Sequence, residues 1–208
     1  RAMSMRAFVS VGDLDVSPTV DAHDESCQKC LQKLDELKRT TELTKDELEE
    51  HHDNVVSYKN RWISGKLLHF VVARFADGVA SAREELTLLL NSQADLHSTA
   101  RYVKEDRYTV ELEAVHIAAG MGSKEALEVL IQRASEKQEY IDKFCTSTDR
   151  ETGLKSDFYA PLHDAAFCAN SAETIKYLLE KRAYADATNI DGYTPLHFVA
   201  KHGVKPEK

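Results

Sequence analysis

The sequence predicts an all-α protein, an α-solenoid of about three and a half repeated helix pairs preceded by an N-terminal helical hairpin. A four-residue pattern that ends in histidine recurs at residues 66–69, 113–116, 160–163 and 194–197. A longer apolar stretch follows each of the first three patterns, at residues 86–90, 126–131 and 174–179. Turn formers are scarce, with 8 Gly and 4 Pro in 208 residues, which disfavours turn-rich β architectures. One helix pair cannot bury its own apolar faces, whereas a stack of pairs can.

The composition argues against several classes of function. Apolar residues make up 42% of the chain, enough for a sizeable core. Lys and Arg number 27 against 35 Asp and Glu, a net charge of −8, so we expect no nucleic-acid partner. No apolar run approaches the ~18 residues of a transmembrane helix, so we expect no membrane insertion. Four cysteines in a chain of this length do not form a disulfide scaffold, and we expect reduced thiols in the cytoplasm.

The N-terminal part divides into two segments. Residues 1–21 carry no helical period, and we expect a disordered or loosely ordered arm. Residues 22–61 are expected to form a helical hairpin, whose first helix presents Leu31, Leu34 and Leu37 on one face. We expect this hairpin to cap the repeats. The alternative is a coiled-coil segment, with self-association through residues 24–60.

The second helix of this hairpin is expected to begin near residue 45. Thr44 and Glu47 have the spacing of a capping box, in which each side chain bonds the backbone N–H of the other residue. We expect this helix to carry Leu48, Val55 and Val56 on its apolar face.

Each later repeat is expected to contain a short first helix, a turn and a longer second helix. Alanines on the first helix let the second approach closely. In the fourth unit Thr194 precedes Pro195, an N-cap residue followed by proline at the first helical position.

These repeats resemble the ankyrin repeat. The fourth unit reads Asp-Gly-Tyr-Thr-Pro-Leu-His at residues 191–197, and the third reads Ala-Pro-Leu-His-Asp-Ala-Ala at residues 160–166. The second unit keeps part of the motif, and the first is degenerate. The resemblance covers about residues 62–203 and implies an ankyrin-repeat domain over residues 62–208. It also implies an L-shaped stack of helix pairs, with hairpin fingers projecting from one edge.

The spacing departs from that family. The repeat histidines are 47, 47 and 34 residues apart, against a family period of about 33, so the first two units each hold ~14 extra residues. In the first unit we place them at residues 75–81 and in an elongated finger region over residues 91–111. In the second unit we expect one helix over residues 124–145, and then a polar loop over residues 146–157. Because the fourth unit stops before its second helix, we expect the natural protein to continue past residue 208.

No motif in the sequence points to catalysis. It lacks GxSxG, GxxxxGK[ST], HExxH and GxGxxG, so we expect a protein that is not an enzyme and has no catalytic residues. We also expect no metal and no cofactor. The repeat histidines lie one per repeat, about 10 Å apart in a helix stack, too far to share a zinc ion. The ankyrin resemblance implies a structural role for them, in which each bonds neighbouring backbone and the threonine of its own turn.

Cys27 and Cys30, together with His51 and His52, are the other candidate ligands. The two thiols face the same side of a helix, but adjacent histidines diverge by ~100°, whereas zinc-finger histidines lie three to five residues apart. We favour buried cysteines on a helix face, with a metal site and a redox pair as the alternatives.

The ankyrin resemblance implies a scaffold or adaptor that binds another protein through its fingers and concave face. The implied contact residues are Tyr159, Tyr193, Phe158, Met121, Phe167, Ile190, Asp191, Lys201 and His202, with Cys168 beside them. Tyr, Phe and Met are enriched in interface cores. We interpret Trp62 as a packing anchor and not as a binding residue. The alternative function is the N-terminal targeting or regulatory region of a larger multidomain enzyme or effector, with its catalytic domain beyond residue 208.

Overall fold

A computed structural model describes residues 25–58, 61–168 and 171–202, without the side chains of Arg61 and His202. The expected N-terminal arm lies outside these residues. The helices are α1 (Glu25–Thr40), α2 (Lys45–Glu49), α3 (Leu67–Ala76), α4 (Ala82–Asn91), α5 (Ala114–Gly120), α6 (Lys124–Arg133), α7 (Lys137–Asp142), α8 (Pro161–Phe167), α9 (Ala172–Glu180) and α10 (Pro195–His202). The strands are β1 (His52–Tyr58), β2 (Arg61–Gly65), β3 (Thr99–Lys104), β4 (Tyr108–Glu113), β5 (Thr146–Asp149) and β6 (Lys155–Asp157).

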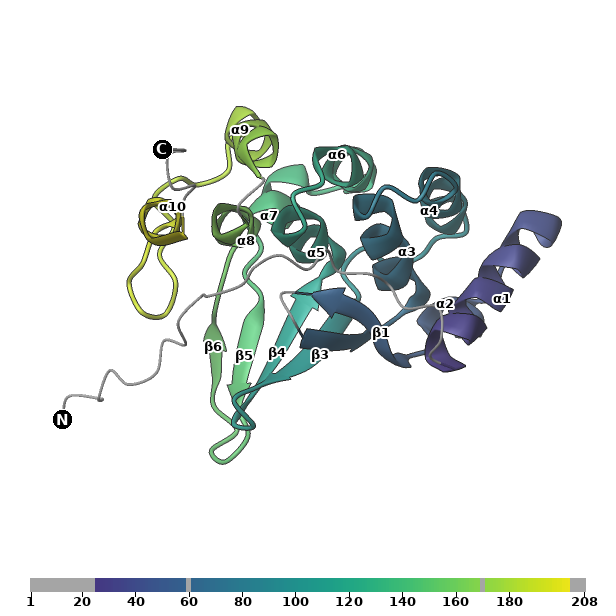
Figure 1. Cartoon of the computed structure of the whole chain (residues 1–208), viewed down its shortest axis with the longest axis horizontal. Coiled ribbons are helices and arrows are strands. Elements are labelled where there is room, and N and C mark those ends of the chain that lie inside the picture. The colour runs from purple at the N-terminus through teal and green to yellow at the C-terminus, as the bar shows by residue number, and fades with distance from the viewer. Residues whose placement is uncertain (1–24, 59–60, 169–170, 203–208) are drawn as a thin grey trace, which may run out of the picture.

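The prediction of an all-α solenoid is wrong, because the strands form an antiparallel sheet in the order β1-β2-β3-β4-β5-β6. They make three hairpins, and each hairpin directly precedes the first helix of a repeat: β1–β2 leads into α3, β3–β4 into α5 and β5–β6 into α8. Figure 1 shows the strands β3 to β6 extending to one side of the helices. The residues that exceed the family period therefore lie partly in paired strands.

The hairpin β3–β4 shows why these segments form strands. Its register runs without interruption from Thr99 opposite Glu113 to Lys104 opposite Tyr108. Along β3, Ala100 is buried between the exposed Thr99 and Arg101, which is the two-residue period of a half-buried strand. A search for helical periods does not find this pattern, and the sequence predicts only an elongated finger over these residues.

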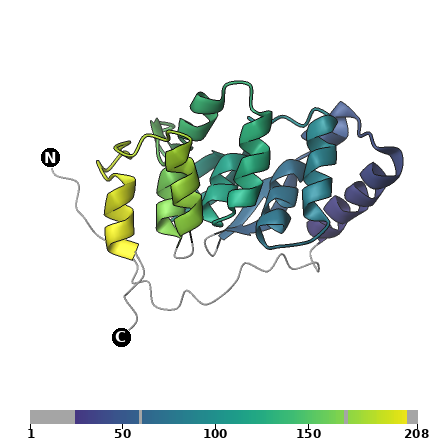
Figure 2. The same ribbon diagram turned by 90° about the horizontal axis from the view of Figure 1, so that it is seen from above.

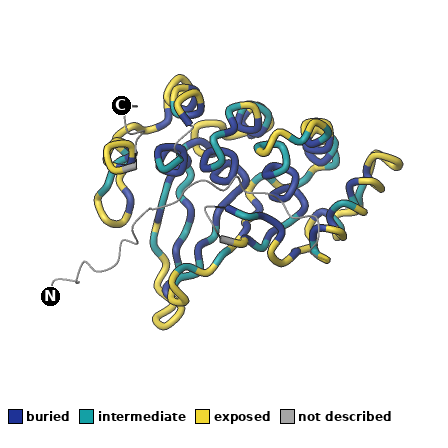
Figure 3. Tube along the Cα trace, in the orientation of Figure 1, coloured by how far each residue is buried: buried dark blue, intermediate teal, exposed yellow. Residues whose placement is uncertain are grey.

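The helices form two rows. The first helices of the repeats, α3, α5, α8 and α10, make the inner row, where each packs on the next, and α4, α6 and α9 make the outer row (Figures 1 and 2). Residues Leu67–Ala73 of α3 and all of α5 are buried, so the core follows the inner row (Figure 3).

The predicted N-terminal helical hairpin is correct as far as the start of its second helix and wrong beyond it. The capping box forms, with the N–H of Thr44 donating to Glu47 Oε2 at 2.8 Å and the N–H of Glu47 donating to Thr44 Oγ1 at 3.3 Å. The helix α2 nevertheless ends at Glu49, and the expected helical stripe at Val55 and Val56 lies in β1. β-Branched side chains favour a pleated, paired strand, and β2 supplies the partner.

The expected continuous helix over residues 124–145 is divided in two. The helix α6 ends at Arg133, because Ala134 turns to an extended conformation with ψ 133°, and α7 begins at Lys137. Tyr140 and Ile141 of α7 are buried, so the apolar pattern was genuine, but a turn brings these side chains to the core. The predicted polar loop over residues 146–157 contains the hairpin β5–β6.

The helix α1 packs against α4 and β1 at the end of the stack. Its apolar face, Cys27, Cys30, Leu34 and Leu37, is buried there. The buried carboxylate of Glu85 in α4 accepts from Lys38 Nζ of α1 at 2.7 Å and from Ser81 Oγ at 2.8 Å. These bonds attach α1 to the first repeat.

Candidate functional site

The most exposed candidate residues lie on the loop that precedes α10. Ile190 is 58% exposed, and Asp191 beside it is also exposed. Asn189 shapes this loop, because its Oδ1 accepts from the N–H of Asp191 at 3.1 Å and of Tyr193 at 2.8 Å. Gly192 occupies the left-handed region with φ 78°, which glycine adopts without a steric cost. The loop therefore presents Ile190 and Asp191 on a defined turn.

A cluster of aromatic rings lies beneath this loop, between α8 and α10. Phe198 is at its centre, with ring centroids 5.4 Å from Tyr159, 5.7 Å from His163 and 6.4 Å from Tyr193. The centroid of the Phe158 ring lies 3.9 Å from the centroid of the Tyr159 ring. Lys104 Nζ, at the end of β3, lies 4.8 Å from the centroid of the Phe158 ring. Edge-to-face ring pairs add stability beyond area burial, so this cluster supports the last repeat.

The repeat histidines connect neighbouring backbone segments. His163 Nδ1 accepts from the N–H of Ala160 at 3.2 Å, so its Nε2 carries the proton and donates to the carbonyl of Tyr193 at 3.1 Å. His69 makes the same pair of bonds, to Lys66 and Ser98, and His197 bonds the N–H and Oγ1 of Thr194. Burial lowers the pKa of His163, which keeps it neutral. These bonds confirm the structural role for these three histidines.

His116 is bonded differently. Its Nδ1 lies 3.0 Å from Asp164 Oδ2 of the next repeat, and its backbone carbonyl accepts from the hydroxyl of Tyr58 at 3.3 Å. All three side chains are buried, and burial raises the pKa of Tyr58 well above its usual value. A Tyr–His–Asp group could transfer protons, but a closed cluster offers no approach to a substrate, so its geometry fits a connection between β1, α5 and α8.

Tyr58 also fits against a glycine. A Cβ built on Gly120 would lie 2.0 Å from the Tyr58 hydroxyl oxygen, so only glycine leaves room for this ring. The hairpin β1–β2 thus packs on α3 and reaches the end of α5 through Tyr58. Sequence reasoning missed the roles of both residues: no motif marks Tyr58, and Asp164 entered only as one letter of the ankyrin-like motif at residues 160–166.

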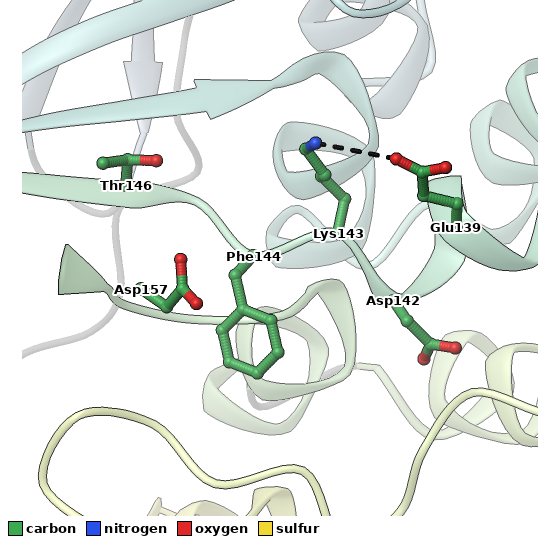
Figure 4. Close-up of a pocket in the computed structure, with 6 residues that line it drawn as sticks. All are labelled: Glu139, Asp142, Lys143, Phe144, Thr146 and Asp157. Atoms are coloured by element: carbon green, nitrogen blue, oxygen red, sulfur yellow. Dashed lines mark ion pairs between the residues drawn. The ribbon is translucent and has the colours of Figure 1, made fainter.

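A depression of about 350 Å³ lies between α7 and the strands β5 and β6 (Figure 4). Figure 4 shows Lys143 directed at Glu139, and the two charges are 3.9 Å apart. Asp142 Oδ1 accepts from the N–H of Tyr184 at 2.9 Å, which ties α7 to the loop after α9. The charged groups of this depression therefore serve packing, and we assign no chemistry to it.

The structure separates the sequence-predicted contact residues into three groups. Ile190, Asp191 and Lys201 are exposed; Tyr159, Tyr193, Met121 and Phe167 are half-buried, as is Cys168; Phe158 is buried. The side chain of His202 lies outside the described residues. The aromatic members come together in the cluster around Phe198, whereas Met121 lies at the end of α5.

Trp62 is not the packing anchor that the sequence predicted. Its side chain is 45% exposed, on the face of β2 opposite the buried Ile63. Trp62 begins the region that was expected to form the repeats, and nothing in the neighbouring sequence signals its exposed position.

Metal and thiol chemistry find little support in the described residues. In this part of the chain no group of three or more His, Cys, Asp or Glu side chains is arranged to hold a metal ion. Cys27 and Cys30 form no disulfide and are fully buried on α1, as favoured above, and burial raises the pKa of Cys30 to about 12. A thiol with such a pKa is a poor nucleophile. Across the same residues no helix is long and apolar enough to span a bilayer.

Comparison with known proteins found one family similarity, which covers the C-terminal part of the chain. Residues 162–207, which include α8, α9 and α10, match the family described as ankyrin repeats (many copies). A search of curated proteins found no match. The matched segment contains the exposed loop and most of the aromatic cluster.

Proposed function

We infer that this chain, whose residues 162–207 are ankyrin repeats, is a scaffold or adaptor that binds a partner protein at its last repeats. Ankyrin repeats are protein–protein interaction modules, and the match falls on the loop before α10. The partner is held by docking alone, with no chemical step, and its identity is open.

The observation that carries this proposal is the exposure of the loop before α10 on a rigid support. Ile190 offers an apolar side chain that is 58% exposed, and Asp191 and Lys201 offer charges of both signs. By contrast, every residue of α5 is buried, and Tyr58 packs against the end of this helix, so the exposed side of the inner row lies toward α10.

The other candidate residues have graded roles in this proposal. The accessible edges of Tyr159 and Tyr193 contact the partner, while Phe158 and Phe167 hold these rings from beneath. Met121 and His202 extend the contact along the inner row. A few such anchors carry most of the binding energy, since interface hot spots are enriched in tyrosine.

A photo-crosslinking experiment tests this surface. A benzophenone amino acid at position 190 is expected to form a covalent adduct with a polypeptide in lysate, and an Asp191→Lys variant of the same probe is expected to lose that adduct. The matched control carries the probe at Leu179, which is 43% exposed on the outer helix α9. Equal adducts from both positions, or none at position 190, would contradict the proposal.

We place the protein in the cytoplasm, a reducing compartment. This rests on its four cysteines, none of which forms a disulfide and three of which are buried. Mass spectrometry of protein denatured and alkylated at the moment of cell lysis is expected to find all four cysteines alkylated, and a disulfide would contradict this placement.

A further inference from the structure

The outer face of the sheet, which we define by Trp62 and Ser64 of β2 and Arg101 and Val103 of β3, points away from the packed side. Ser64 is the register partner of Arg101, and these residues alternate with the buried Ile63 and Ala100. Together with Arg150, which follows β5, they line a depression of about 530 Å³. No part of the proposed partner surface near α10 contributes to it.

The depression has an apolar floor that the fold does not use. Trp62 is 45% exposed and Val103 is 47% exposed, on neighbouring strands. A half-exposed tryptophan is costly to leave in water and is the residue type most enriched at binding hot spots. Trp62 is also the single tryptophan of the chain.

The charge of the depression is opposite to that of the whole chain. Arg101 and Arg150 line it, and no carboxylate does, although the net charge of the chain is −8. Within the described residues neither arginine forms an ion pair, and Arg150 Nη1 donates to the carbonyl of Asp106 at 3.1 Å, which holds the guanidinium in place. Glu111 lies opposite Arg101 in the register, and its carboxylate has Lys155 Nζ 3.9 Å away.

We propose that the outer face of the sheet is a second docking site, which takes an acidic peptide segment bearing an apolar side chain. The apolar side chain packs on Trp62 and Val103, while carboxylates pair with Arg101 and Arg150. Planar guanidinium groups pair with carboxylates through two parallel hydrogen bonds, which favours arginine at such a site. A nucleic-acid strand fits less well, because it needs a continuous run of cations along its phosphates, and the hairpin tip beside this face carries Glu105 and Asp106.

The fluorescence of Trp62 tests this site directly, because no other tryptophan contributes to the signal. The probe is a blocked peptide with the sequence Glu-Asp-Glu-Phe-Asp-Glu, titrated into the full chain. We expect a saturable change in emission that weakens with added salt. The matched peptide Gln-Asn-Gln-Phe-Asn-Gln is expected to bind at least about fivefold more weakly, the scale of a few exposed ion pairs.

Variants then assign the binding to the depression. With a fluorescein-labelled acidic peptide, the double variant Arg101→Gln and Arg150→Gln is expected to lose at least about fivefold in affinity, and Trp62→Ala a comparable amount. The matched control is Arg83→Gln, an exposed arginine on α4. The proposal is overturned if the neutral peptide binds as well, if the arginine variants bind like wild type, or if a uridine decamer binds more tightly than the peptide. Because none of these residues belongs to the α10 surface, either site can fail without the other.

Discussion

At the scale of single residues, the buried His69 stabilises the fold by remaining neutral. Burial lowers the pKa of His69 to about 4, against about 6.5 in an unfolded chain. The unfolded state therefore binds more protons than the folded state between these two values. The contribution of His69 to the free energy of unfolding is complete above pH 6.5, and it is lost as the pH falls toward 4.

This difference predicts a pH-dependent stability. Between pH 7 and pH 5, His69 is expected to remove about 1–2 kcal/mol from the free energy of unfolding. Urea unfolding at both pH values should show this loss in wild type and a smaller loss in His69→Gln. The control is His197→Gln, at an exposed repeat histidine. It should lose as much unfolding free energy between pH 7 and pH 5 as the wild type. If His69→Gln loses as much unfolding free energy between the two pH values as the wild type, His69 does not titrate as described.

A second prediction concerns the outer helices. Leu178 of α9 is fully buried, whereas the adjacent Leu179 is 43% exposed. We expect Leu178→Ala to cost about 2–5 kcal/mol of unfolding free energy, the range for a buried leucine truncation. Leu179→Ala should cost less than about 1 kcal/mol by the same urea measurement, and equal losses would contradict the described packing of α9.

At the scale of elements, the hairpin β1–β2 distinguishes this protein from a plain row of helix pairs. It pairs with β3 near its base, and its far end reaches α5 through Tyr58. The helix α1 packs against the same hairpin. The N-terminal segment thus stabilises the first repeats from the inner side as well as from the end of the stack.

The contact of Tyr58 with Gly120 predicts a reversal of sign in a double-mutant cycle. Gly120→Ala should destabilise the wild type by about 1–3 kcal/mol, because the added methyl group overlaps the ring. In a Tyr58→Ala background the same change should stabilise the protein by up to about 1 kcal/mol, since alanine is the better helix former. Thermal and urea unfolding of the four proteins measure the coupling. A coupling near zero would place the hairpin away from α5.

At the scale of the whole molecule, the apolar stripe of α1 determines the expected state of association. Cys27, Cys30, Leu34 and Leu37 are buried within one chain, against α4 and β1. The alternative of self-association through residues 24–60 would need this stripe to be free.

We therefore expect a monomer in solution. Light scattering coupled to size exclusion should give the mass of one chain over a tenfold range of concentration. Leu31 lies at the partly buried edge of the stripe. If the wild type has the mass of two chains and Leu31→Glu has the mass of one, self-association through this segment is supported instead.

The sequence predicted those features that one segment specifies alone. The first N-terminal helix, the capping box at Thr44, the paired helices of the repeats and the roles of three repeat histidines follow from local patterns. The sheet did not. Its three hairpins are local but follow a two-residue period that a search for helical periods does not find, and the pairs β2–β3 and β4–β5 join segments that are far apart in the chain. The apolar stripe over residues 124–145 predicted one continuous helix, and this was wrong. A turn at Ala134 ends the helix while the apolar side chains on both sides of the turn stay buried.

By itself, the sequence determined that the chain carries ankyrin-like helix pairs and lacks a recognisable catalytic motif, because both depend on residue types at short spacings. Only the tertiary structure decided that the fingers pair into a sheet, that β1–β2 packs on α3 and reaches α5, and that Trp62 faces outward. These outcomes depend on which surfaces meet: Val55 and Val56 can lie on a helix or in a strand, and the partner strand selects between them.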